Sequence, residues 1–417
     1  MNNFWTLVTI ARRNILRNRR RSAFCVTASA IAVFFIIFMQ SWIAGMVSNI
    51  HDVVRTFDTG DVNIVSADYD AQSEYLPVQF PVSDGKSFEG LKAGIEAERG
   101  VKAVFPRIMT FATLQDSTVK HALLWGIDIE RETAFQDFNK NRRDDGLVEG
   151  RYPAPGKNEC AIGYKLAEKM GAGIGSHIPL KTVSAQFSDK MWNPVITGIF
   201  NFDYLKYDDG VLIVRFERLQ RLLTLDDGTQ QMFVYTENPK TSAETAGALA
   251  ALLGSGDVVH DWRDNYFVAL MEKSMLVYAL VYVVFIVVAS FLIVNTMIMI
   301  IHERIKEIGM MGSLGMTRSE IALVFFLEAF LLSAAGALAG CIAGGAASFV
   351  MSFFPLDFNM LTGGGMKEMP VSGTLRLKFD WLILLQGFLL GVGVSSVCTL
   401  IPSLKSAFTE PVEALRR

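Results

Sequence analysis

The residues able to do chemistry in this chain do not form a catalytic constellation. Five histidines are scattered, without the spacing of a metal-binding motif: His51, His121, His177, His260 and His302. The run GAGIG at 171–175 lacks the Gly-Lys-Ser/Thr ending of a phosphate-binding loop, and the two Asp-Asp-Gly runs at 208–210 and 226–228 are typical of turns. We therefore expect no catalytic residue, no metal and no cofactor bound by this chain itself.

The polar groups that stand out lie inside apolar runs. Four runs exceed the roughly 20 apolar residues that cross a bilayer: 23–50, 273–301, 320–354 and 380–404. In lipid, unpaired backbone groups are so costly that each run must be a helix. Asn295 lies in the second run and Glu328 in the third. A carboxylate there usually faces protein or water, so we expect Glu328 to pair, or to anchor helix packing.

Small residues recur at four-residue spacing in the third and fourth runs. Gly336, Gly340 and Gly344 share one face of the third run, and Gly387 with Gly391 repeats the spacing in the fourth. Such spacing lets helix backbones approach closely in membranes. We interpret these glycines as packing positions rather than as a gate.

The composition supports a membrane protein with one large domain outside the lipid. Apolar residues make up 51% of the 417 residues, and a net charge of −3 gives no indication of a nucleic-acid partner. The first run is longer than the core of a cleaved signal peptide, so an uncleaved anchor is the better interpretation. Cys160 is the lone thiol of the domain, so no disulfide is expected within it.

Lysine and arginine in the short segments predict the orientation. Twelve lie in residues 1–22, 302–319 and 405–417, against three in 355–379. We therefore expect both termini to lie on the cytoplasmic side of a bacterial inner membrane. They are an amphipathic basic arm (1–22) and a tail (405–417). The domain at 51–272 and the short loop at 355–379 would then be periplasmic.

The 51–272 segment alternates between strand and helix patterns. VFPRIMTFATLQ and HALLWGI are typical of strands, whereas FEGLKAGIEA and YKLAEKMG are typical of helices. No regular βα alternation is present. The predicted fold class is thus an α-helical membrane protein with four transmembrane helices and a large α+β domain inserted between helices 1 and 2.

The helical pattern of the second span continues over 265–308, which would be roughly 65 Å long at 1.5 Å per residue. Such a helix would project from both membrane faces, unless it breaks near Lys273 or His302. The segment that follows, 302–319, contains charged residues, then glycines, then Thr317 or Ser319 as the N-cap of the third span. We predict a compact elbow suited to a groove on a partner, although an ordinary loop would also fit this pattern.

This elbow resembles the coupling helix of permeases in the family that includes MacB, the lipoprotein-releasing Lol permeases and FtsX. The matching positions are Glu303, Arg304, Glu307, Ile308, Gly309, Leu314 and Gly315. The ending IPSLKSAFTEPVEALRR is similar to the family's C-terminus. The stretches 150–180 and 193–214 are similar to the periplasmic core of Lol and MacB permeases. Between them, KTVSAQFSDKMWNP is shorter than the hairpin of chaperone-dependent Lol permeases, so docking of a periplasmic chaperone stays open.

The resemblance implies a non-catalytic ABC transporter permease that works by mechanotransmission, closest to LolC and LolE. It implies a cytoplasmic ATPase dimer that binds ATP and Mg²⁺ and docks on 302–319, and a second permease, identical or paralogous. The implied cargo is lipophilic, such as a lipoprotein moved from the inner to the outer membrane. Phe38, Met39 and Trp42 could line its access route, or simply contact lipid. The alternatives are a MacB-like exporter and an FtsX-like regulator of a cell-wall hydrolase.

Overall fold

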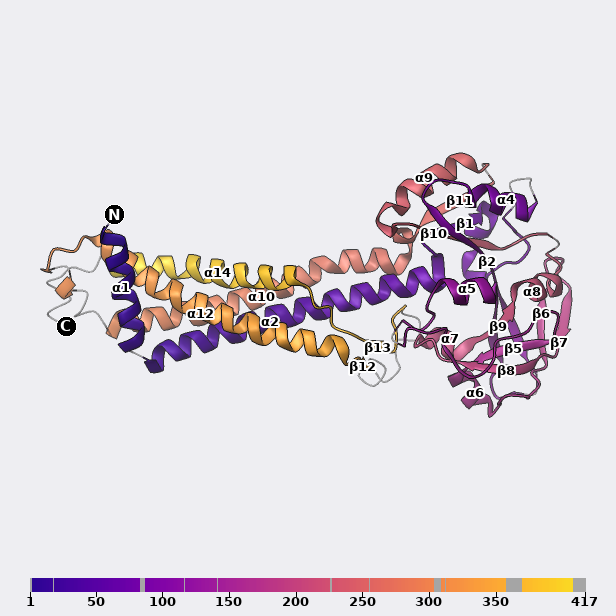
Figure 1. Cartoon of the computed structure of the whole chain (residues 1–417), viewed down its shortest axis with the longest axis horizontal. Helices are drawn as coiled ribbons and strands as arrows, with labels where there is room; N and C mark the ends of the chain where they lie inside the picture. The colour runs from indigo at the N-terminus through magenta and orange to yellow at the C-terminus, as the bar shows by residue number, and fades with distance from the viewer. Residues whose placement is uncertain are drawn as a thin grey trace. The chain divides into compact units, whose positions relative to one another are not determined.

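The computed structural model describes residues 2–17, 19–82, 87–115, 117–140, 142–225, 227–254, 256–303, 309–311, 313–357 and 370–407 (Figure 1). The chain divides into two compact units. The first comprises Met1–Met46, Lys273–Leu356 and Arg376–Arg417, and the second comprises Val47–Glu272 and Asp357–Leu375. We call them the helical unit and the sheet unit.

Five long helices contribute to the helical unit: α1 (Asn2–Arg17), α2 (Arg19–Val53), α10 (Tyr266–Glu303), α12 (Arg318–Phe353) and α14 (Trp381–Ala407). Among the described residues, four segments are long and apolar enough to cross a membrane: Ser22–Thr59, Tyr266–Val288, Arg318–Phe353 and Trp381–Leu400. The predicted long second span is continuous through Lys273. The end predicted for it, residues 304–308, lies outside the described residues.

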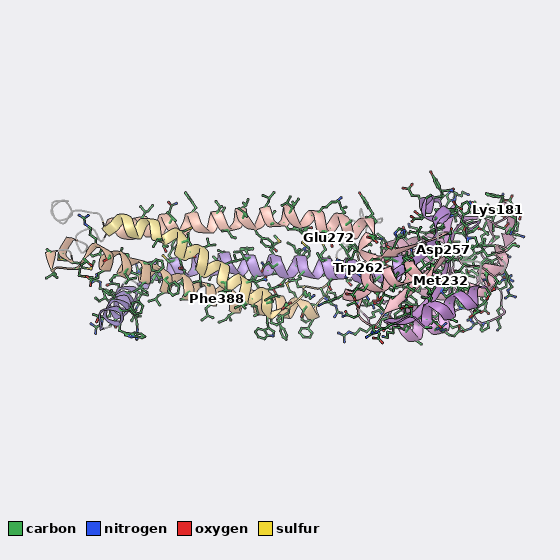
Figure 2. All side chains as sticks on the ribbon, turned by 90° about the horizontal axis from the view of Figure 1, so that it is seen from above. Lys181, Met232, Asp257, Trp262, Glu272 and Phe388 are labelled. Atoms are coloured by element: carbon green, nitrogen blue, oxygen red, sulfur yellow. The ribbon has the colours of Figure 1, made fainter. Side chains whose placement is uncertain are left out.

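The core of the helical unit lies where α2, α12 and α14 meet. Val33, Ile37 and Ala337 are buried there, and Phe388 on α14, labelled in Figure 2, packs against them. The N-terminal helix α1 packs on α12 and buries Leu7 and Ala11. The predicted amphipathic arm therefore contacts protein along part of its apolar face.

One mixed sheet organises the sheet unit, in the order β11-β1-β10-β2-β3-β9-β5-β8-β4, with β6 joined to β2 and β7 to β6. The strands are β1 (Val62–Ser66), β2 (Val101–Leu114), β3 (His121–Ile127), β4 (Leu147–Gly150), β5 (Glu159–Gly163), β6 (Leu180–Val183), β7 (Asp189–Trp192), β8 (Val195–Phe200), β9 (Val211–Arg215), β10 (Gln231–Thr236) and β11 (Asp257–Asp261). A separate small sheet pairs β12 (Leu356–Asp357) with β13 (Thr374–Leu375).

Strand β2 joins the two halves of this sheet. Its first part, up to Arg107, pairs with β10, and its second part, from Ile108, pairs with β3. The sequence predicts a strand here, which the structure confirms over Val101–Leu114. The change of partner in mid-strand comes from long-range pairing, which the local pattern does not contain.

The other helices and turns described in the sheet unit are η1 (Val54–Thr59), α3 (Ala67–Asp70), η2 (Ser73–Tyr75), α4 (Phe88–Glu96), α5 (Ile129–Phe135), α6 (Tyr164–Met170), α7 (Leu205–Gly210), α8 (Phe216–Leu222), η3 (Pro239–Thr241), α9 (Ser242–Leu252) and η4 (Trp262–Asp264). The helix predicted at YKLAEKMG is α6, which ends at Gly171 in the left-handed conformation. The turn predicted at 208–210 is wrong, because these residues belong to α7.

The segment Asp357–Leu375, apart from 358–369, is described and groups with the sheet unit. The backbone N–H of Ser372 donates to Asn49 Oδ1 at 2.9 Å, and that of Thr374 donates to Asp203 Oδ2 at 3.1 Å. The sequence gives no sign that this short segment belongs with the distant domain.

Candidate functional site

The predicted coupling segment is described on both sides of a gap. Glu303 is the last residue of α10, and the chain is helical again at 309–311, where Gly309 is buried. Three of the predicted coupling residues lie outside the described residues: Arg304, Glu307 and Ile308. The structure therefore gives the geometry of the second half of this segment.

That second half ends in a tight helix stop at Gly315. Gly315 has a φ of +92°, and the N–H of Met316 donates to the carbonyl of Met311 at 3.2 Å, the long bond of a Schellman motif. Met311 and Met316 pack against the buried Ile321 and Phe325 of α12. A side chain at position 315 would strain this backbone, so the glycine fixes the bend.

The described part of the elbow exposes the apolar side chains of Met310 and, more fully, Leu314. Leu314 is 85% exposed. Three residues later Thr317 caps α12, as predicted: its hydroxyl accepts from the N–H of Glu320, and the Glu320 carboxylate accepts from the N–H of Thr317. A large apolar side chain held outward by such a frame is suited to a pocket on a partner.

Glu328 and Asn295, the two polar residues that the sequence singles out in the spans, differ in environment. Glu328 is buried on α12, and Asn14 of α1 donates an amide N–H to its Oε2 at 3.5 Å. A partner contributed by protein is what an intramembrane carboxylate requires. Asn295, by contrast, is exposed on α10. The structure therefore does not bring these two residues together.

The glycines of α12 face α2. An ideal Cβ on Gly336 would come 2.5 Å from Cβ of Ser29, and one on Gly344 would come 3.2 Å from Cβ of Ile37. Gly387 of α14 approaches Ile37 from the other side. Ile37 thus sits between two glycine surfaces, which is the packing arrangement that the spacing predicts.

Phe38, Met39 and Trp42 are half-buried on α2. The ring of Phe38 stacks on that of Phe34 with centroids 5.9 Å apart. An apolar hollow of about 530 Å³ lies elsewhere, between α12 and α14, and is lined by Cys341, Ile342, Gly345, Ala346, Phe349, Phe379, Trp381 and Leu384. The three predicted access residues do not line this hollow.

Within the sheet unit, a π-helical turn, η1, directly follows α2 and forms the junction between this helix and β1. Two tyrosine hydroxyls from the sheet unit bond its carbonyls: Tyr207 donates to Phe57 and Tyr235 donates to Arg55, both at 3.0 Å. Gly60 then ends the turn with a φ of +68°. Because π turns are rare and concentrate at functional positions, we regard this junction as part of the functional site.

Phe57 anchors that turn in an aromatic cluster. Its ring centroid lies between 4.8 and 6.1 Å from those of five other rings: Trp125, Phe138, Phe202, Tyr204 and Tyr207. All six rings are buried. Aromatic pairs at these separations stabilise beyond the area they bury, so η1 is held firmly by the domain.

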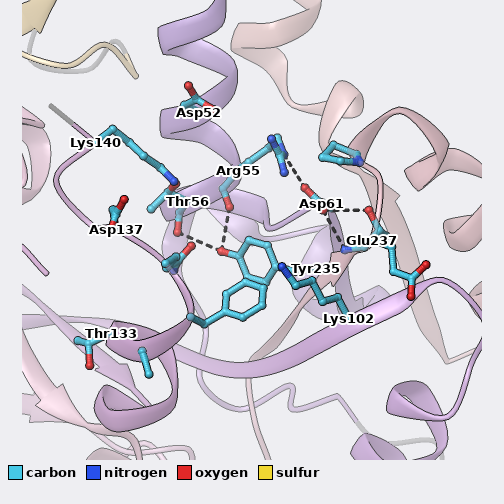
Figure 3. A pocket seen from close by; sticks show the side chains of 15 residues that line it. Asp52, Arg55, Thr56, Asp61, Lys102, Thr133, Asp137, Lys140, Tyr235 and Glu237 are labelled. Atoms are coloured by element: carbon cyan, nitrogen blue, oxygen red, sulfur yellow. Dashed lines mark hydrogen bonds and ion pairs between the residues drawn. The ribbon is translucent and has the colours of Figure 1, made fainter. Parts of the chain in front are cut away.

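A polar pocket of about 400 Å³ opens beside the junction (Figure 3). Arg55 pairs with Asp61 at 2.5 Å, and the other Asp61 oxygen accepts from the N–H and hydroxyl of Thr236, both at 2.9 Å. Lys102 lies over the Phe135 ring, 5.0 Å from its centroid. The pocket carries charges of both signs, and its buried carboxylate serves to hold Arg55 in place.

A second buried charge lies at the partner switch of β2. Arg107 is sandwiched between the rings of Trp125 and Phe233, 4.5 and 4.8 Å from their centroids. Its Nη2 lies 2.5 Å from Glu132 Oε2, without the alignment of a hydrogen bond. Burial raises the pKa of Glu132 to about 7, against the opposing effect of the Arg107 charge.

Asp208 is a buried carboxyl on α7. Its Oδ1 accepts from the N–H of Phe202 at 2.8 Å. Burial raises the pKa of Asp208 to about 8, even though this hydrogen bond favours the ionised form. The folded domain therefore favours a neutral side chain here.

Sequence reasoning missed the junction residues and Arg107. A charge at position 107 inside the apolar strand pattern VFPRIMTF was the available signal, because a buried guanidinium requires partners. Tyr207 and Tyr235 carried no comparable signal, since their contacts with η1 join residues about 150 and 180 positions apart.

The short segment at 181–194 forms a β-hairpin. Strands β6 and β7 pair antiparallel, with Val183 opposite Asp189. Phe187, in the turn between them, is 76% exposed and has a φ of +57°. The structure thus contains a hairpin at this place, and it is short, as the sequence indicates.

Two family models match the chain. Residues 22–252 match the MacB-like periplasmic core domain, and residues 279–411 match the C-terminal part of FtsX-like permeases. The first match covers more than half of the chain. Together the two include the candidate spans Ser22–Thr59, Arg318–Phe353 and Trp381–Leu400, and the end of Tyr266–Val288.

Curated relatives include the lipoprotein-releasing system transmembrane protein LolC of Xylella fastidiosa (strain Temecula1), 22% identical over 338 residues, which are 76% of this chain and 78% of the relative. LolC of Haemophilus influenzae is 26% identical over 354 residues, 81% of each chain. Among solved structures, the extracellular domain of the noncanonic ABC-type transporter YknZ is 16% identical, covers 48% of this chain and 99% of that one, and has a TM-score of 0.31.

Proposed function

This chain belongs to the MacB/FtsX/Lol family of ABC transporter permeases, and on that premise we propose that it extracts lipoproteins from the inner membrane for transfer to the outer membrane. The observation that carries the proposal is the extent of the similarity to LolC proteins. It covers 76% of this chain and 78% of a relative named for lipoprotein release. The similarity therefore includes both the spans and the domain.

In this proposal the chain hydrolyses nothing. Permeases of this family are non-catalytic subunits, and ATP with its Mg²⁺ would be bound by a partner ATPase dimer. The docking segment would be the elbow, through Glu303, Arg304, Glu307, Ile308, Gly309, Leu314 and Gly315. Support comes from the described half of the elbow, where a rigid bend at Gly315 presents the exposed Leu314.

Motion would pass to the domain along continuous helices. Helix α10 has 38 residues, or roughly 57 Å, against a hydrocarbon layer of about 30 Å. Helix α2 has 35 residues and is followed directly by the turn that the aromatic cluster holds. A stiff element that continues past the lipid and ends in a rigid anchor can transmit displacement with little loss.

The expected orientation has both termini in the cytoplasm and the sheet unit in the periplasm. A second permease, identical or paralogous, would complete the assembly, and a periplasmic chaperone would be a further partner. We propose that the cargo is lipophilic and passes along α2 beside Phe38, Met39 and Trp42. Support comes from α2 itself, which packs through Val33 and Ile37 and leaves these three side chains half-buried.

A MacB-like exporter is the second candidate, because the domain matches the MacB-like core over residues 22–252. An FtsX-like regulator is the third, because residues 279–411 match the FtsX-like model. The three candidates differ in the molecules expected to accompany the permease. These are acylated lipoproteins for lipoprotein extraction, a soluble substrate with an adaptor for the exporter, and a cell-wall hydrolase for the regulator.

The test is purification of the tagged chain from native membranes, followed by mass spectrometry. We expect an ABC ATPase and acylated lipoproteins, with the lipoproteins released on addition of ATP and retained with a non-hydrolysable analogue. A hydrolase without lipoprotein would move the assignment to the regulator. Absence of any ATPase from the purified complex would overturn the proposal.

A further inference from the structure

An open groove of about 530 Å³ lies on the sheet unit, away from the polar pocket. Met109 and Phe111 of β2 and Leu123 of β3 form its floor. Leu76, which follows η2, and Leu205 of α7 form its walls. The same sheet face is covered farther along by the aromatic cluster, against which Met109 and Leu123 pack. The groove is thus an uncovered continuation of a core surface.

Phe111 gives the strongest indication that a ligand covers this surface. It is 52% exposed although it lies within a 14-residue strand, directly opposite Leu123 in the antiparallel register. Phe111 adjoins the half-buried Met109 and Leu123 in this concave site, and a concave apolar surface with an exposed aromatic side chain is typical of ligand sites. Isolated exposed residues would need no such explanation.

Leu76 provides a second, independent sign. Its φ of +48° places a branched side chain in the left-handed region, which disfavours residues other than glycine and asparagine. Strained backbone persists where the surrounding structure imposes it, and it concentrates at binding sites. Here the strained residue lines the groove.

The backbone of the floor excludes an added peptide strand. Strand β3 is paired with β2 on one side and with β9 on the other. Between the β10 and β6 pairings, β2 uses side chains: the N–H of Met109 donates to Gln230 Oε1 at 2.7 Å, and the carbonyl of Phe111 accepts from Thr182 Oγ1 at 2.9 Å. A peptide would find no backbone partners here, whereas a hydrocarbon chain needs none.

The charges on the rim are largely balanced within the protein. Lys206 lies 3.9 Å from Asp58, and Asp209 pairs with Lys169. Glu74 and His121 complete the charged and titratable groups of the lining. A rim without a strong excess of either sign is complementary to an uncharged ligand.

We propose that this groove holds an acyl chain of the lipidated cargo after the chain has left the membrane. That the chain belongs to cargo rests on the proposed function, whereas the preference for hydrocarbon rests on the groove itself. Each buried methylene adds favourable transfer free energy, so a long saturated chain gains affinity without specific polar contacts. The groove would shield the chain from water until a receiving protein takes it.

Photolabelling of the full chain in lipid nanodiscs tests this. The probe is palmitic acid with a diazirine near its methyl end, and the labelled peptides are mapped by mass spectrometry. We expect labels within 73–76, 109–111, 121–123 and 205–210. We also expect a loss of about tenfold in Phe111→Gln, because one buried aromatic contact corresponds to roughly that factor. The matched control is Phe187→Gln, an exposed phenylalanine outside the groove, which should label like the native chain.

Competition experiments distinguish the two possible sources of the acyl chain, a lipoprotein and a membrane phospholipid. A triacylated lipopeptide should displace the probe, and dioleoyl phosphatidylethanolamine at equal chain concentration should not. Equal displacement by the phospholipid, labelling confined to the spans, or unchanged labelling of Phe111→Gln would each overturn the inference. ATP-driven lipoprotein release by the purified complex is measured in parallel. Release without groove labelling rejects the groove alone, whereas no release by the native complex rejects the proposed function.

Discussion

Gly340 of α12 lies so close to Ala30 of α2 that an ideal Cβ on the glycine would come 2.5 Å from the alanine carbonyl oxygen. No real Cβ tolerates such a separation from backbone, so the two helices can meet here only through glycine. On its other flank the same α2 surface meets Gly391 of α14 through Val33. Close packing of α2 against α12 and α14 therefore depends on glycine, which has no side chain, at these contact positions.

We predict that Gly340→Ala lowers the thermal unfolding midpoint of the purified chain, through an overpacking cost of about 1–3 kcal/mol. The matched control is Gly393→Ala on α14, where nothing lies within 4 Å of the added Cβ. The control should leave the midpoint unchanged or raise it. Equal behaviour of the two variants would contradict this packing.

The elbow prediction concerns Leu314. Leu314→Asp should leave folding unchanged, because the side chain is exposed. It should weaken co-purification of the ATPase by about tenfold or more, the effect of losing one apolar hot spot. Leu252→Asp, an exposed leucine in the sheet unit, is the control. Retention of the ATPase by the elbow variant at the native level would remove Leu314 from the docking surface.

For the junction, we expect Tyr207→Phe to destabilise the sheet unit by about 1 kcal/mol, because the carbonyl of Phe57 loses its buried donor. Phe57→Ala should cost about 3–5 kcal/mol. Denaturant unfolding of the purified chain measures both changes, with the exposed Tyr75→Phe as control. In the complex, the two junction variants should hydrolyse ATP with reduced release of cargo. A parallel fall in both activities would indicate a folding defect instead.

The pair formed by Arg107 and Glu132 gives a test based on charge. Arg107→Met alone should cost about 3–5 kcal/mol, because it leaves the Glu132 carboxyl buried without a partner. The double variant Arg107→Met with Glu132→Gln should recover most of that loss. Thermal unfolding of the native chain, both single variants and the double variant completes the cycle. Additive losses would show that the two residues do not act as a pair.

Asp208 predicts a pH dependence. Because its pKa rises on folding to about 8, the folded state holds a proton that the unfolded state releases. The contribution of Asp208 is therefore fully present below its ordinary pKa near 4. It falls by on the order of 1 kcal/mol per pH unit until about pH 8. Asp208→Asn should flatten the decline in unfolding midpoint between pH 5 and pH 8, and a variant with the native slope would contradict this account.

The sequence predicted best what depends on neighbouring residues. The spans follow from apolar length, the Thr317 cap from residue type, and the short helix α6 from its apolar spacing. Strand β2 was also predicted, because its apolar pattern is local. Each of these features can be recognised within a window of about twenty residues.

What could not be predicted depends on pairing between distant segments. Nothing in the local pattern places β3 parallel to β9, makes 208–210 part of a helix, or brings Ser372 beside Asn49. The roles of the elbow residues, Asn295 and the α2 residues remain predictions, since they concern partners. For those of these residues that the structure describes, it shows the burial and the neighbouring side chains. It also reveals the junction between α2 and β1, which the sequence did not suggest.

The first and last strands of the large sheet in chain order, β1 and β11, pair with each other, with Val62 opposite Asp261. The domain's beginning and end are therefore neighbours, and everything between them forms a closed excursion of the chain. A domain whose two ends are adjacent can be replaced or lengthened as a unit. The helices that flank it can keep their own sequence. Diversity of cargo among permeases of this design can accordingly arise by changing one contiguous stretch of gene.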